Sequence, residues 1–91
     1  LIKIIALAKS AIRNNLGEEL KDIKVPTLLI WGNNDTITPP FVGKEFERLI
    51  PDAQLHFIDH CGHAPMMERP DQFNQLLSEF LEKQNQIVSR Q

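Results

Sequence analysis

Two residues whose side chains can perform acid–base chemistry stand in matched positions along this sequence. Asp35 lies four residues after Trp31, and His63 lies four residues after Asp59, in each case just past an apolar, strand-like segment. A carboxylate that orients an imidazole supplies two of the three members of a nucleophile–histidine–acid triad. The pattern therefore predicts the acid–base half of a hydrolase site, with Asp35 and His63 as its catalytic residues.

The segments around these two residues predict alternating strands and helices. An unbroken apolar run between Pro26 and Gly32 is typical of a strand buried on both faces. Apolar residues at helical spacing after Pro39 and after Pro70 are typical of amphipathic helices. We expect Thr38 to cap the first of these helices, with Pro39 at its first position. The predicted elements are a strand at 27–31, a turn at 32–35, a helix ended by Pro51, a strand at about 54–59 and a helix at about 70–83.

This order of elements predicts an α/β fold, a βαβα unit with two parallel strands, because a helix connects the strands. The carboxyl ends of neighbouring parallel strands meet at one edge of the sheet, with the strand axes ~4.8 Å apart. Loops of equal length from that edge can bring Asp35 beside His63. Two strands with apolar faces are too few to form a stable sheet alone. We therefore expect missing strands, or self-association of the chain, to complete the sheet.

The first residues predict another helix in front of this unit. Apolar side chains recur at helical spacing from Leu1 to Leu16, and Gly17 is a typical C-terminal stop. The predicted organisation is a leading helix at 1–17 and a βαβα segment at 18–91. The leading helix is apolar over a broad face, and the sequence begins with leucine rather than methionine. Both observations favour a segment of a longer protein.

Asp35 and His63 each have a simpler explanation as well. Asp35 alone is most often an Asx-turn residue leading into the Thr38 cap, and His63 alone is most often a loop histidine bonded to backbone. Their matched settings, acid then histidine after successive strands, favour the paired role. Gly62 would let the backbone turn tightly beside the ring. In such a pair the acid fixes the imidazole tautomer, while the other ring nitrogen takes a proton from a nucleophile.

Other chemically capable side chains support less. His60, Cys61 and His63 lie close together, but no second ligand cluster stands at the spacing of structural zinc sites, so no metal is predicted. Cys61 is expected to be a buried or half-buried thiol rather than a nucleophile. His56 is expected to be exposed or bonded to backbone, and Glu68 to accept hydrogen bonds from amides of its loop or helix. Without a glycine-rich phosphate motif, no cofactor is predicted.

No residue of the 91 matches the setting of a hydrolase nucleophile. The serines are Ser10, Ser78 and Ser89, and none is flanked by the small residues of a Gly-x-Ser-x-Gly elbow. No His-Gly-Gly stretch offers the amides of an oxyanion hole. Most of the catalytic free energy of a triad enzyme depends on these parts. We therefore expect the isolated chain to be inactive.

Composition narrows the functional classes further. The chain has 91 residues and a net charge of −2, with both signs interspersed, so nucleic acid and membrane surfaces are not expected partners. At this length it forms at most one small domain. The longest apolar runs are shorter than the ~20 residues that a membrane-spanning helix requires. One cysteine excludes an internal disulfide and suits a reducing compartment, so a cytoplasmic location is expected.

Two motifs in this chain resemble the C-terminal part of the α/β-hydrolase superfamily. Residues 25–35 with Thr38 and Pro39 form the first, and residues 62–70 followed by an amphipathic helix form the second. The likeness covers roughly residues 23–83 and is close to the esterase, meta-cleavage-product hydrolase and epoxide or haloalkane hydrolase branches. In that superfamily the acid follows the penultimate core strand and the histidine follows the last one.

The resemblance assigns Asp35 and His63 to the positions of acid and histidine. It places residues 1–17 near the end of the lid or just after it. It implies a parent enzyme that acts on a small-molecule substrate, an ester or another bond opened by nucleophilic attack. The alternative hypothesis is a non-catalytic module that uses the same βαβα unit for self-association or partner binding.

Overall fold

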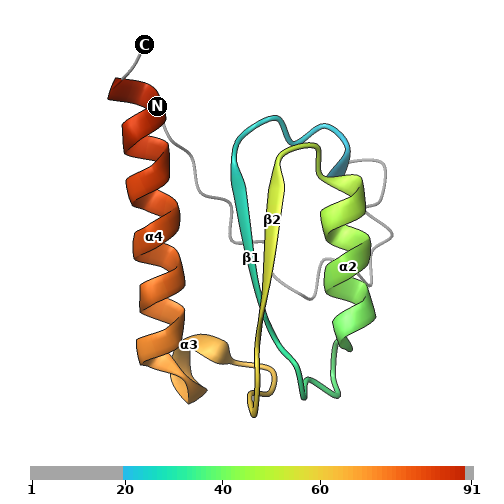
Figure 1. Cartoon of the computed structure of the whole chain (residues 1–91). Coiled ribbons are helices and arrows are strands. Elements are labelled where there is room, and N and C mark those ends of the chain that lie inside the picture. Colours follow the sequence, from blue (N-terminus) through green and yellow to red (C-terminus); the bar gives the residue numbers. More distant parts are fainter. Residues whose placement is uncertain (1–19, 90–91) are drawn as a thin grey trace.

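The computed structural model describes residues 20–89, and the predicted leading helix at 1–17 lies outside this range. Strands and helices alternate along the described chain, and an additional short helix precedes the last one (Figure 1). The elements are β1 (Thr27–Gly32), α2 (Pro40–Leu49), β2 (Ala53–Ile58), α3 (Pro65–Glu68) and α4 (Pro70–Ser89). The predicted α/β class and the βαβα order are confirmed.

The two strands pair in parallel, with Thr27 opposite Ala53 and Gly32 opposite Ile58. This register aligns the two carboxyl ends, so the loops after β1 and β2 leave the sheet side by side. Figure 1 shows α2 on one side of the strand pair and α4 on the other. Helix α2 contacts both strands, and α4 contacts β1. The arrangement has three layers, and both faces of β1 are covered, as its unbroken apolar sequence predicted.

The main core lies between the strands and α2. Five buried side chains form it, and partly buried apolar residues surround them. The core residues are Leu20, Leu29, Trp31, Phe46 and Ile50. The rings of Trp31 and Phe46 meet edge to face, with centroids 5.9 Å apart and an interplanar angle of 88°, a geometry that aromatic pairs favour. Gly43 lets α2 approach this closely, because a Cβ there would stand 2.9 Å from Cδ2 of Trp31.

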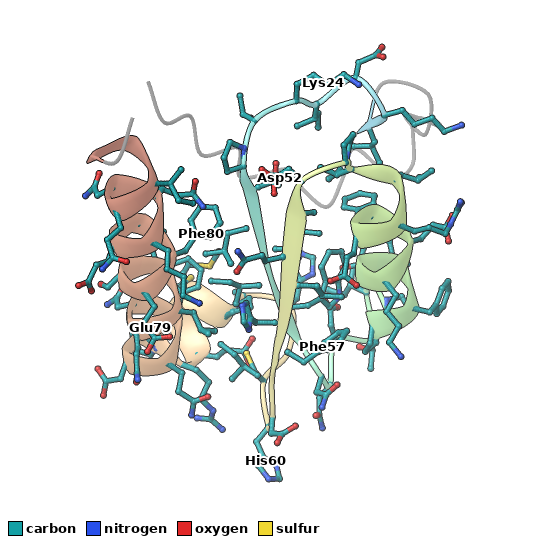
Figure 2. All side chains as sticks on the ribbon, turned by 45° about the horizontal axis from the view of Figure 1, so that its top comes forward. Lys24, Asp52, Phe57, His60, Glu79 and Phe80 are labelled. Carbon is teal, nitrogen blue, oxygen red and sulfur yellow. The ribbon has the colours of Figure 1, made fainter. Side chains whose placement is uncertain are left out.

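Side chains on the other face of β1 point toward α4, since successive residues of a strand alternate in direction. Leu28 is buried on this face, and Phe80 of α4 is only 3% exposed (Figure 2).

Within residues 20–89 no helix has the length and apolar character needed to cross a membrane.

The boundaries of two helices differ from the prediction. Helix α2 begins at Pro40, and Pro39 is the N-cap in an extended conformation without a side-chain cap bond. Thr38 therefore does not cap the helix, because its hydroxyl bonds to Asp35 instead. Helix α4 continues beyond Lys83, where the predicted helix ended, to Ser89. No glycine or proline interrupts residues 84–89, and Gln84 is buried.

Replacing Phe46 by alanine should remove one half of the aromatic contact that joins α2 to β1. We expect the free energy of unfolding to fall by about 3–5 kcal/mol, as for other large core truncations. Phe41, on the same helix, is 70% exposed, and Phe41→Ala should change stability by no more than about 0.5 kcal/mol. Urea denaturation of both variants checks the prediction. Equal losses would contradict the placement of the core between α2 and the sheet.

Candidate active site

Backbone hydrogen bonds join the loop after β1 to the loop after β2. The amide of Asn33 donates to the Ile58 carbonyl at 2.9 Å, and the amide of Asn34 donates to the Cys61 carbonyl at 2.8 Å. The Asn33 side chain also donates to Asp59 Oδ1 at 2.7 Å. These bonds continue the pairing of the strands beyond their ends, so the two loops hold a fixed relative position.

Gly32 lies where these loops approach most closely. A Cβ at this position would collide with the carbonyl oxygens of Gly62 and Cys61. The next turn begins immediately, because the Asp35 amide donates to the Gly32 carbonyl at 3.2 Å. Any side chain at position 32 would therefore separate the loop of Asp35 from the loop of His63.

The Asp35 carboxylate is buried and fully engaged. Its side chain has no exposed surface. Oδ1 accepts the amides of Ile37 and Thr38, both at 2.9 Å, and Oδ2 accepts the Thr38 hydroxyl at 2.9 Å. The Asx-turn role considered from the sequence is therefore present, but it uses mainly Oδ1. These donors stabilise negative charge on the carboxylate.

Trp31 fixes the far side of this turn. Its indole Nε1–H donates to the Thr38 carbonyl at 2.8 Å, so Thr38 is bonded both through its backbone and through its hydroxyl. The core residue that packs against Phe46 thus also positions the residue that bonds the carboxylate. The hydroxyl of Thr38 was not predicted as part of the site, because its position before two prolines favoured a helix cap.

The imidazole of His63 reaches Asp35 across the two loops. Its Nδ1 lies 3.3 Å from Asp35 Oδ2 and 3.5 Å from the Thr38 hydroxyl oxygen. The His63 side chain is 44% exposed, whereas its carboxylate partner is buried. With the proton on Nδ1, the ring donates to Asp35, and Nε2 is then the ring nitrogen that can accept a proton. The structure thus brings together the two residues that the sequence paired.

Glu68, the last residue of α3, holds the backbone on both sides of His63. Its Oε1 accepts the Gly62 amide and its Oε2 accepts the Ala64 amide, each at 3.0 Å. The hydrogen bonds from Ala64 and Gly62 lower the pKa of the Glu68 carboxyl below its ordinary value of 4.5. The expectation that Glu68 accepts bonds from loop amides is confirmed. The short helix itself was not predicted, although proline at its first position, Pro65, is a typical start signal.

Two further candidates, Cys61 and His60, lie in the loop after β2. Cys61 is buried, 1% exposed, with its thiol 3.8 Å from the Gly62 carbonyl oxygen. His60 adopts a positive φ of 52° at the tip of the loop after β2 and points away from the rest of the molecule (Figure 2). In the described part of the chain, no three histidine, cysteine or acidic side chains cluster in a way that could hold a metal ion.

Comparison with known proteins identifies the family. The sequence matches the α/β hydrolase fold family over residues 4–70, most of its length. The chain belongs to this family. Among curated relatives, the 2-hydroxy-6-oxononadienedioate/2-hydroxy-6-oxononatrienedioate hydrolase 2 of Pseudomonas putida is 37% identical over 68 residues, which are 75% of this chain and 24% of that protein.

Two other matches show the breadth of the likeness. The pimeloyl-(acyl-carrier protein) methyl ester esterase of Nitrosomonas europaea is 42% identical over 60 residues, 66% of this chain and 24% of that protein. An α/β hydrolase from the sediment metagenome of the Mar Chica lagoon in Morocco is 55% identical, with a TM-score of 0.77, covering 88% of this chain and 36% of its own. The chain thus spans about a quarter of the length of the curated relatives it matches.

Gly32→Ala tests the close approach of the two loops. We expect a loss of about 1–3 kcal/mol in the free energy of unfolding, because a backbone clash cannot be relieved by a rotamer change. Gly62→Ala is the matched control. The atoms nearest to its Cβ would be the two carboxylate oxygens of Glu68, the end of a flexible side chain, at 3.2 Å, and neither glycine has a positive φ. Thermal or urea denaturation of both variants distinguishes them. A Gly32→Ala protein as stable as Gly62→Ala would contradict the described packing.

Proposed function

We propose that this chain supplies the acid and the histidine of an α/β-hydrolase active site. Asp35 is the orienting acid, and His63 is the general base and then the general acid. The contact between His63 Nδ1 and the buried Asp35 carboxylate carries the proposal. Membership of a hydrolase family supports it.

The chemistry follows from the roles of the two ring nitrogens. Asp35 holds the proton on Nδ1, so that Nε2 accepts the proton of an attacking nucleophile and later delivers it to the leaving group. The positive charge that forms on the ring faces the carboxylate, which stabilises it. The His63 side chain is 44% exposed, so a reacting group can approach it.

The nucleophile and the oxyanion hole come from outside these 91 residues. None of the three serines stands in a nucleophile elbow, and the chain matches only about a quarter of each curated relative. We therefore assign residues 18–91 to the βαβα segment of a hydrolase domain and residues 1–17 to a leading helix. The 91-residue chain alone is inactive in this assignment.

The substrates of the relatives indicate the reaction class. The relatives include a 2-hydroxy-6-oxononadienedioate/2-hydroxy-6-oxononatrienedioate hydrolase and a pimeloyl-(acyl-carrier protein) methyl ester esterase. The enzyme that contains this segment accordingly hydrolyses a small-molecule ester, or a bond opened by the same nucleophilic attack.

A hybrid enzyme provides the direct test. In it, this chain replaces the matching segment of the 55%-identical Mar Chica hydrolase. With an activated ester as substrate, His63→Ala should lower kcat by about 10⁴-fold or more, and Asp35→Asn should lower it somewhat less. Asparagine keeps the shape but favours the wrong tautomer.

Two exposed residues serve as matched controls for this test. His60→Asn, which removes an exposed imidazole at a position whose positive φ asparagine tolerates, and Asp52→Asn change side chains outside the pair and should leave kcat unchanged. Near-normal turnover in either site variant would contradict that residue's role. A folded hybrid without activity would contradict the proposal that Asp35 and His63 can serve as the acid and the histidine of a hydrolase.

A second candidate function, self-association, rests on the sheet itself. Within residues 20–89 the sheet has only two strands, so each keeps one edge without a strand partner. Exposed strand edges with apolar faces favour pairing with another chain. The isolated 91-residue chain should therefore form dimers or larger assemblies in light scattering across a concentration series. A folded monomer at the highest concentration would exclude this function.

A further inference from the structure

Backbone hydrogen bonds tie the loop after β2 to the loop after β1 at Ile58 and at Cys61, before His63 is reached. Residues 59–64 belong to neither a helix nor a strand, and the His63 side chain is nearly half exposed. The contacts of the ring Nδ1, 3.3 Å to Asp35 Oδ2 and 3.5 Å to the Thr38 hydroxyl oxygen, are long for hydrogen bonds. The position of the imidazole therefore depends on how firmly the His63 backbone is held.

Glu68 provides such a restraint on both sides of the ring. The amides of Gly62 and Ala64 belong to the residues immediately before and after His63, and one carboxylate binds both at 3.0 Å. The two bonds fix the peptide units that set the direction of the His63 Cα–Cβ bond. Because Glu68 closes the short helix that starts at Pro65, the helix connects the restraint to α4.

We infer that Glu68 is a positioning residue for His63. The Glu68 carboxylate holds the imidazole at the distance and angle that proton transfer requires. This inference rests on the proposed function of His63. The Glu68 carboxylate bonds to backbone amides. Its effect on the reaction passes through the backbone, and misplacing a catalytic group by about 1 Å can lower a rate by roughly a hundredfold.

Glutamine at position 68 is the discriminating substitution. It matches glutamate in size, yet its side chain has one acceptor oxygen and one NH2 group. The NH2 group would face one of the two backbone N–H groups, and two donors cannot form a hydrogen bond. Glu68→Gln should therefore keep the helix but release one side of the loop. Glu68→Asp keeps the charge and is too short to bridge both amides. Glu47→Gln, on the exposed surface of α2, controls for loss of a charge.

The first measurement is kinetic and uses the hybrid enzyme. Glu68→Gln should lower kcat by roughly ten- to a hundredfold while KM stays within about twofold. The kcat of Glu68→Asp should lie between that of Glu68→Gln and that of the parent hybrid. Glu47→Gln should match the parent. A Glu68→Gln enzyme with the kcat of Glu47→Gln overturns the inference, and so does a loss confined to KM.

The second measurement does not depend on turnover. In proton NMR, the Nδ1–H of His63 bonded to Asp35 should give a downfield resonance that Glu68→Gln broadens or removes, with the signals of His56 and His60 unchanged. An unchanged Nδ1–H resonance overturns the inference. If His63→Ala keeps full activity, the proposed function fails instead, so the two failures are separable. A general loss of dispersed resonances in both Glu68 variants would assign Glu68 a purely structural role and also overturn the inference.

Discussion

The arrangement of this site depends on the parallel pairing of β1 and β2. Their register ends both strands at one level, and the amides of Asn33 and Asn34 extend the contact into the loops. Two residues 28 positions apart in sequence, Asp35 and His63, thereby meet. If the strands slipped by one residue, every side chain would change face and the two loops would no longer align.

The turn at Asp35 combines structural and chemical demands in one carboxylate. Oδ1 accepts the two amides that close the turn, whereas Oδ2 faces the Thr38 hydroxyl and the His63 ring. The indole of Trp31 bonds the same turn from the core. Packing between sheet and helix therefore determines where the acid lies, which links the stability of the fold to the geometry of the pair.

Periodicity and turn chemistry were enough to predict the fold class, the strand order and the meeting of Asp35 with His63. Proline boundaries and unbroken apolar runs are local signals, and the parallel edge follows from them. Two details, one within the turn at Asp35 and one at the end of α4, were not predicted. Thr38 bonds a carboxylate rather than capping α2, and α4 continues past Lys83, where Gln84 is buried. The sequence pattern does not decide whether the Thr38 hydroxyl bonds to Asp35 or to a helix amide. It also does not show that Gln84 becomes buried.

Helix α2 lies between Asp35 and His63 in the sequence. The hydrogen bonds described above for these two side chains involve no side chain of α2. It meets the strands through Gly43 and Phe46, while Phe41 and its neighbours on the outer surface face away from the core. That outer surface is therefore open to evolutionary drift: substitutions can accumulate there, altering solubility or recognition by other molecules, at little cost to the geometry of the acid and the imidazole.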